Sequence, residues 1–228
     1  IRERERGVGY RSILRIGPAG EKLITYASVT AETYRHFGRL GLGAVFGSKK
    51  LKALMITGKQ TLNIVDKKAF RQLYNRIYNE ATTSAVMRKY HDIGTPINVN
   101  NLNLLKALPT KNLQKAEFDK VEKLTGEHIA ENYLGRRVAC AHCPIACIHL
   151  ANLRESYKDS PYFKKTTFVG YDYEIIFALG TMLEISEPND LFLLTEEVER
   201  YCMDAMSTGV ILAWVTEMFE KKLINTKE

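Results

Sequence analysis

The sequence predicts an α+β protein in which a short β-rich segment precedes a mainly α-helical domain. Two observations lead to this prediction. Within residues 1–60, short apolar runs are separated by glycine-containing turns, which is typical of strands. From about residue 66, apolar residues instead recur at helical spacing. We therefore expect one domain over residues 1–60 and a second over residues 61–228.

Composition narrows the classes of protein that fit. The chain has 228 residues, is 45% hydrophobic and carries a formal net charge of +7. No run of about 18 apolar residues occurs, so no membrane span is expected. The cations form no stripe with interleaved aromatic residues, which argues against nucleic-acid binding. Three of the four cysteines are clustered, which favours a reducing cytoplasm over a disulfide framework.

The first domain has three predicted strands and one glycine-rich stretch. Strands are expected over residues 10–16, 22–29 and 51–58, with a turn at 17–20 and a helical turn or loop at 31–37. Four glycines in ten residues mark the stretch from Gly38 to Gly47. Such a backbone can approach a ligand closely, and its N–H groups, with Arg39 and Lys49, suit phosphate oxygens. The alternative is a tight turn, and the spacing matches neither a Walker loop nor a dinucleotide fingerprint.

The second domain is predicted to consist mainly of helices. Asp66 can cap a helix running to about residue 90, and Gly94 to Pro96 interrupts the helical pattern. Residues 152–170 are polar and lysine-rich, and we expect a surface insertion there. Further helices are expected over residues 96–108, 125–134, 173–183, 188–203 and 209–222.

Cysteines spaced C-x2-C-x3-C form the most specific motif in the chain. Cys140, Cys143 and Cys147 can wrap one soft metal centre, and a helix beginning near Cys143 would bring Cys147 to the same side. A [4Fe–4S] cluster with a fourth ligand elsewhere is the leading interpretation. A zinc site completed by His142, His149 or Cys202 and a set of buried structural cysteines are the alternatives.

Taken together, these stretches resemble the aldehyde:ferredoxin oxidoreductase family. Residues 16–21 are similar to its IGPAGE block, and residues 38–53 to its GRGGLGAVMGSKNLKA block, with Leu40 in place of a glycine. Residues 108–112 are similar to LPTRN, and residues 140–147 to CxxCPIGC. Tyr173-Glu174 stands where the family has EYE, and residues 203–214 resemble LDTISTGVTIAW.

The resemblance implies which cofactors the protein uses and which part of the family's fold this chain covers. The cofactors are a tungsten or molybdenum bis-pyranopterin, with Mg²⁺ bridging its phosphates, and a nearby [4Fe–4S] cluster on the three cysteines. The chain then spans the end of the first domain and most or all of the second, a fragment expected to be inactive alone. The implied cofactor-binding residues are Arg39, Gly41, Gly43, Gly47, Ser48, Lys49, Glu199 and Asp204.

The sequence departs from the family at its D-x-x-G-x-D pterin motif. This motif aligns with residues 199–204, where Glu199 replaces the first acid and Cys202 replaces the glycine. A glycine would let backbone approach the cofactor closely, whereas a cysteine side chain takes up that space. Cys202 is interpreted as core packing, with an altered pterin contact or a substitute metal ligand as alternatives.

The implied reaction is the two-electron oxidation of an aldehyde to a carboxylic acid, with electrons passing through the cluster to ferredoxin or another electron-transfer subunit. By resemblance, Glu174 is the candidate general base and Tyr173 a hydrogen-bond donor. The apolar helix predicts a desolvated Glu174 with a raised pKa, and a helix-capping or arginine-paired carboxylate is the alternative. We expect a homo-oligomer or larger complex. A related enzyme such as an aromatic acyl-CoA reductase, a stand-alone cluster or zinc-binding module, and a truncated partner-binding subunit remain alternatives.

Overall fold

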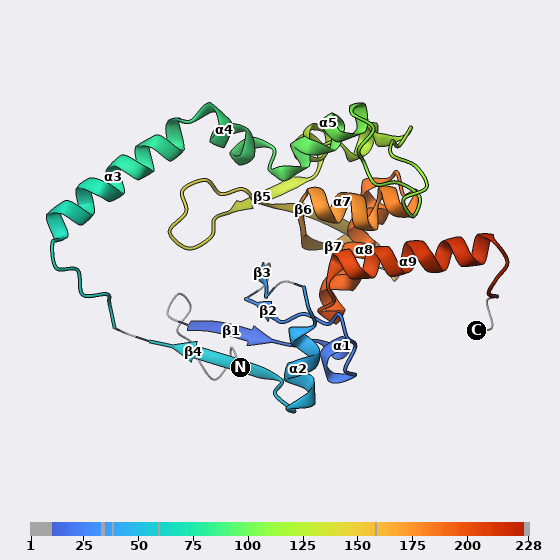
Figure 1. Ribbon diagram of the computed structural model, residues 1–228, viewed down its shortest axis with the longest axis horizontal. Helices are drawn as coiled ribbons and strands as arrows, with labels where there is room; N and C mark the ends of the chain where they lie inside the picture. Colours follow the sequence, from blue (N-terminus) through green and yellow to red (C-terminus); the bar gives the residue numbers. More distant parts are fainter. Residues whose placement is uncertain (1–10, 33–34, 38, 59, 158, 226–228) are drawn as a thin grey trace. The chain divides into compact units, whose positions relative to one another are not determined.

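The computed structural model describes residues 11–32, 35–37, 39–58, 60–157 and 159–225. Tyr10, residues 33–34, Gly38 and Lys158, which the predicted ranges include, lie outside the described residues. Helices and small antiparallel sheets are both present, which confirms the predicted α+β class (Figure 1). In the part of the chain that the structure describes, no helix combines the length and apolar character that a membrane span requires. The chain divides into two compact units, residues 1–74 with 198–204, and residues 75–197 with 205–228.

The first unit is built on a four-stranded antiparallel sheet in the order β3-β2-β1-β4. Its central pair has Arg11 opposite Thr57 and Arg15 opposite Ala53. Ile13 and Val29 are among the buried residues of this unit. The elements are β1 (Arg11–Arg15), α1 (Pro18–Glu21), β2 (Thr30–Ala31), β3 (Arg35–His36), α2 (Leu42–Ser48) and β4 (Ala53–Thr57).

Two of the predicted strands hold, and the other secondary-structure predictions for this unit are wrong. Strands β1 and β4 lie within the predicted strands 10–16 and 51–58. The predicted strand at 22–29 is absent, because the chain leaves α1 through a left-handed residue, Leu23, and the amide of Ile24 bonds the carbonyl of Ala19. In sequence these apolar residues resemble a strand, but in the structure they form turns. The turn expected at 17–20 is the one-turn helix α1, and in place of the helical turn or loop expected at 31–37, Ala31 and Arg35–His36 lie on the paired strands β2 and β3. The glycine-rich stretch also forms a helix, α2, where a loop was expected.

The second unit packs helices with a three-stranded antiparallel sheet in the order β5-β6-β7 (Figure 1). Leu150 on β6, Ile176 on α7 and Phe192 on α8 are fully buried. The last residues of α8, from Val198, are assigned to the first unit. The strands are β5 (Leu134–Val138), β6 (Ile148–Tyr157) and β7 (Ser160–Tyr171). The helices are α4 (Ala85–Asp92), η1 (Thr95–Ile97), α5 (Asn98–Leu104), η2 (Val121–Leu124), α6 (Gly126–Asn132), α7 (Tyr173–Leu179), η3 (Thr181–Leu183), α8 (Pro188–Tyr201) and α9 (Ala205–Glu220).

Helix starts are where the sequence was most informative. Helix α3 (Lys67–Thr83) begins after Asp66, whose carboxylate accepts the amides of Lys68 at 2.9 Å and Ala69 at 2.8 Å. The predicted helix 66–90 is interrupted at Ser84, which caps α4 by accepting the amide of Met87. A serine at an N-cap position satisfies a free amide and so favours a new helix start.

The predicted surface insertion at 152–170 is wrong. These residues form most of the β6–β7 hairpin, which runs in register from His149 opposite Tyr171 to Ser156 opposite Lys164. Leu153 and Val169 are buried, whereas Lys165 is exposed and pairs with Glu196 at 3.1 Å. The polar residues therefore belong to the exposed side of a hairpin, and their number concealed the strand pattern.

Candidate functional site

The acidic motif, residues 199–204, belongs to the first unit, although most of that unit lies far earlier in the chain. Met203 forms an antiparallel bridge with Ala27. The carbonyl of Cys202 accepts the amide of Ser28 at 2.8 Å, and the amide of Asp204 donates to the carbonyl of Tyr26 at 2.9 Å. Backbone hydrogen bonds thus fix residues 202–204 to residues 26–28.

Both acids of the motif lie beside basic side chains of the same unit. The guanidinium Nε of Arg39 donates to Asp204 Oδ2 at 3.1 Å, and Asp204 is almost buried. His36 Nε2 lies 3.0 Å from Glu199 Oε2. Arg39 and Asp204 were predicted as cofactor contacts from two different motifs, and the structure brings them together. His36 was missed, because no spacing or motif in the sequence singles it out.

The glycines of the glycine-rich stretch are required by packing within the first unit. A Cβ added to Gly43 would lie 2.6 Å from the carbonyl oxygen of Ser28, and one at Gly47 would lie 1.9 Å from that of Gly20. Gly41 has φ +74°, and a Cβ added there would lie 2.1 Å from the carbonyl oxygen of Thr25. The space that the absent side chains leave is therefore filled by the protein's own backbone.

Hydrogen bonding in α2 also differs from the expected free phosphate cradle. The amide of Gly43 donates to Ala27 at 2.9 Å, and the amides of Ala44 and Val45 both donate to Gly41. Ser48 Oγ donates to the carbonyl of Val45 at 2.9 Å. The cationic side chains are free to reach solvent, since Lys49 and Arg39 are exposed. In this stretch an anionic ligand would therefore bind the charged side chains of Arg39 and Lys49, because the amides of residues 43–45 already donate to backbone carbonyls.

Cys202 is buried in the first unit. Its Sγ accepts a hydrogen bond from Thr30 Oγ1 at 3.2 Å, and its backbone has φ +54°. A left-handed φ is the conformation that favours glycine, which gives a backbone reason for the glycine that the family pattern has at this position. The side chain packs inside the unit that lacks the three clustered cysteines.

The cysteine motif lies in the second unit, on the connection between β5 and β6. Val138 pairs with Ile148, so residues 139–147 form a hairpin loop, and no helix begins near Cys143. The amide of Cys143 donates to the carbonyl of Cys140 at 3.0 Å, which closes a turn. Cys140 and Cys147 are exposed, Cys143 is half-buried, and all three are free thiols.

The three free thiols on this loop are three of the four thiolates that a [4Fe–4S] cluster takes, so the residue types present fit this group. Among the described residues, no three histidine, cysteine, aspartate or glutamate side chains are grouped as they would be around a single metal ion. His149 is fully buried, and its Nε2 lies 2.9 Å from the carbonyl of His91. Burial lowers the pKa of His149, so the ring is neutral and donates this bond from Nε2.

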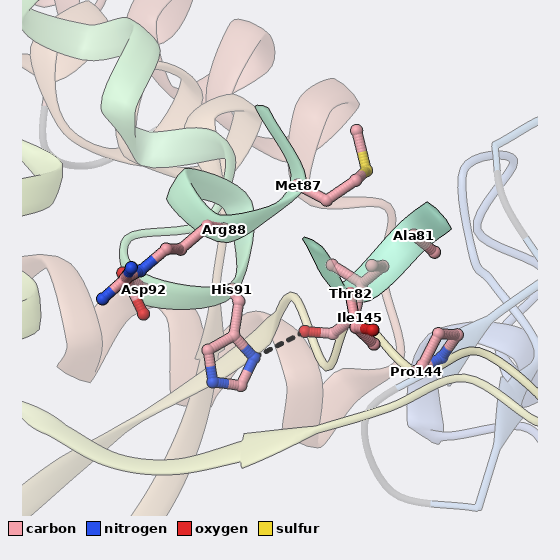
Figure 2. A pocket seen from close by; sticks show the side chains of 8 residues that line it. All are labelled: Ala81, Thr82, Met87, Arg88, His91, Asp92, Pro144 and Ile145. Carbon is pink, nitrogen blue, oxygen red and sulfur yellow. Dashed lines mark hydrogen bonds and ion pairs between the residues drawn. The ribbon is translucent and has the colours of Figure 1, made fainter. Parts of the chain in front are cut away.

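Figure 2 shows a pocket beside the cysteine loop, between the C-terminal end of α3, α4 and the loop itself. Its volume is about 460 Å³, and both polar and apolar side chains line it. A dashed line in the figure marks the hydrogen bond from His91 Nδ1 to the carbonyl of Ile145, which measures 2.7 Å. The lining residues are Ala81, Thr82, Met87, Arg88, His91, Asp92, Pro144 and Ile145.

The candidate catalytic pair begins helix α7. Asp172 caps this helix by accepting the amide of Ile175 at 2.9 Å, and the amide of Tyr173 donates to Thr95 Oγ1 at 3.0 Å. Burial, followed by the neighbouring charge of Glu174, raises the pKa of Tyr173. Glu174 itself is exposed, which contradicts the expected desolvation, because the apolar residues of α7 lie on its other faces. The capping role falls to Asp172 instead.

Family comparisons agree across both units. The family described as "Aldehyde ferredoxin oxidoreductase, domains 2 & 3" matches residues 69–228, and the one described as "Aldehyde ferredoxin oxidoreductase, N-terminal domain" matches residues 1–58. The chain belongs to the aldehyde ferredoxin oxidoreductase family.

Individual relatives share the sequence or the fold. A tungsten-containing aldehyde ferredoxin oxidoreductase of Thermococcus kodakarensis is 34% identical over 99% of this chain and 36% of its own length. One from Pyrococcus furiosus is 34% identical over 95% of this chain and 34% of its own. The active site complex BamBC of benzoyl coenzyme A reductase aligns with a TM-score of 0.69 at 19% identity, over 95% of this chain and 33% of that one. The chain thus spans about a third of the relatives' length.

Proposed function

We propose that the complete protein oxidises aldehydes to carboxylic acids at a tungsten or molybdenum pterin centre, and that electrons leave through a [4Fe–4S] cluster to ferredoxin. The main support is that the glycine-rich stretch and the acidic motif belong to the same unit. Both were expected to bind the same cofactor, and Arg39 joins Asp204 across them. The relatives that are 34% identical are named for this activity and for tungsten.

The residues of the first unit suit a phosphorylated pterin. The amino and N–H groups of a pterin are donors that carboxylates accept, which is the role proposed for Glu199 and Asp204. Exposed cations attract phosphate oxygens, which is the role proposed for Arg39 and Lys49, with Mg²⁺ between the phosphates. Gly41, Gly43, Gly47 and Ser48 shape α2, which carries Lys49 at its end. When bound, the metal–pterin group supplies the two-electron redox chemistry.

The proposed reaction takes its oxygen from water. An aldehyde and one water give a carboxylic acid, two protons and two electrons. We assign Glu174 the role of general base that accepts a proton from water, and Tyr173 that of hydrogen-bond donor to the substrate oxygen. The raised pKa of Tyr173 keeps its hydroxyl protonated and able to donate. Cys140, Cys143 and Cys147 are proposed to hold the cluster that passes electrons onward, with a fourth ligand outside these three.

Substrate, partner and location complete the proposal. Aldehyde is preferred because a Pyrococcus furiosus relative named an aliphatic sulfonate oxidoreductase subunit is less similar, at 27% identity. The likeness to a benzoyl coenzyme A reductase subunit shows the fold alone. Free clustered thiols fit a reducing cytoplasm, and assembly into a homo-oligomer or larger complex is part of the proposal.

Iron analysis tests the cluster assignment. The full-length protein, purified anaerobically, is expected to contain about four iron and four sulfide per chain, as a [4Fe–4S] cluster requires. Tungsten or molybdenum should be present in the same preparation. One zinc and no sulfide would refute the cluster and favour the zinc-binding alternative.

Cys202 provides a second test. Because its Sγ is buried against Thr30 in the other unit, Cys202→Ser in the full-length protein is expected to retain all iron and the visible absorption of the cluster. Cys143→Ser is the matched variant and is expected to lose the cluster. If a folded Cys202→Ser protein lost its iron, the fourth thiolate would have to be assigned to Cys202.

A further inference from the structure

We infer that His91 is a positioning residue that holds the cysteine loop in place for its cluster. This inference rests on the proposed iron–sulfur function of the loop. His91 occupies the last turn of α4, and its Nδ1 lies 2.7 Å from the carbonyl oxygen of Ile145. A carbonyl only accepts hydrogen bonds, so Nδ1 carries the hydrogen and donates it.

Ile145 lies midway between two of the three clustered cysteines. It follows Cys143 by two residues and precedes Cys147 by two, so a bond to its carbonyl restrains the backbone between these two thiols. The neighbouring Ala146 has a left-handed φ of +52°, and this segment belongs to no helix or strand. Among the hydrogen bonds of the described residues, the turn from Cys143 to Cys140 and the bond from His91 restrain this loop between the end of β5 and the start of β6.

His91 is itself fixed by the two strands that carry the loop. Its carbonyl oxygen accepts Arg137 Nε from β5 at 2.9 Å and His149 Nε2 from β6 at 2.9 Å. Arg137 and His149 are paired directly across these strands. Arg137 also donates to the carbonyl of Asp92 at 3.3 Å. The backbone of His91 therefore binds the base of the hairpin while its side chain binds the middle of the loop.

His91, which is distant in sequence, thus bonds three parts of the hairpin: β5, β6 and the loop between them. The expected consequence is that the side chain of His91 limits loop motion and keeps the cluster thiolates in position. The side chain is exposed at the pocket of Figure 2, so substitutions there leave the hydrophobic core untouched. Arg88 lies on the same helix and lines the same pocket, but pairs with Asp92 and makes no bond to the loop.

Three variants of the full-length, cluster-loaded protein test the inference. His91→Phe keeps the ring volume and removes the donor, and we expect iron loss to a chelator to become about five- to tenfold faster, the effect of one hydrogen bond. The electron paramagnetic resonance signal of the reduced cluster should broaden. His91→Asn retains an amide donor at the same side-chain position and should restore both properties. Arg88→Gln is the control and should match the wild type.

Hydrogen exchange of residues 139–148 provides a readout that does not depend on the cluster. It should quicken in His91→Phe and stay at the wild-type rate in His91→Asn and Arg88→Gln. Wild-type exchange and iron retention in His91→Phe would overturn the role of His91. An absence of iron and sulfide from the wild type would refute the proposed function instead, and the exchange rates would still decide whether His91 holds the loop.

Discussion

Replacing Glu174 with glutamine in the full-length, cofactor-loaded protein is expected to lower aldehyde turnover at least about 100-fold. A positioned general base typically contributes about 10²–10⁴-fold in rate, and glutamine keeps the shape while removing the proton-accepting charge. Because the carboxylate is exposed in the first turn of α7, its loss should leave the fold intact. The measurement is turnover of a small aldehyde with a viologen acceptor, beside melting temperature and metal content.

Glu127→Gln is the matched control for this substitution. Glu127 is also exposed, and it also lies in the first turn of a helix, α6. Both glutamine variants lose one favourable charge near a helix N-terminus, which contributes about 0.3–1 kcal/mol, so their melting temperatures should fall equally little. Only Glu174→Gln should lose activity. If Glu174→Gln kept its turnover, or lost it in step with unfolding, Glu174 would be a structural residue.

Gly43→Ala is expected to destabilise the first unit and deprive the full-length protein of tungsten or molybdenum. The new Cβ would lie 2.6 Å from the carbonyl oxygen of Ser28 and 2.7 Å from the carbonyl carbon of Ala27. Backbone atoms cannot rotate aside as a flexible side chain can, so we expect a loss at the upper end of the usual overpacking range, about 3 kcal/mol. Thermal unfolding and metal analysis measure the two effects.

Gly58→Ala is the control, since a Cβ at Gly58 would meet nothing within 4 Å. It should leave stability and metal content unchanged. Iron should remain in Gly43→Ala, because the cysteine loop belongs to the other unit. A Gly43→Ala protein with the wild-type melting temperature would show that α2 can move away from residues 27 and 28, and would weaken the packing explanation for the glycines.

Features encoded by neighbouring residues were predictable from the sequence. Asp66 caps α3 as expected, and α6 begins where a helix was predicted, with Thr125 as its cap, because a side-chain acceptor next to free amides acts over three residues. The C-x2-C-x3-C motif identified the loop by residue type alone. The strand predicted at 22–29 failed, since an apolar run can be buried through turns as well as through a ladder. The hairpin at 148–171 was missed, because its exposed side is rich in polar residues.

The α+β class, the starts of α3, α6, α7 and α8, and the family resemblance that the comparisons confirm follow from local sequence. The helix expected from residue 209 begins earlier, at Ala205, and α1, α2 and α4 were not predicted. The sequence also supplies the thiol set proposed for the cluster, Cys140, Cys143 and Cys147. Which distant segments meet depends on the packing of whole elements. This packing joins Asp204 to Arg39 in one unit and His91 to Ile145 in the other. Local patterns report the preferences of residues a few positions apart, whereas these contacts depend on how whole elements pack. For the same reason, periodicity could not show that Gly43 faces backbone or that Glu174 faces solvent.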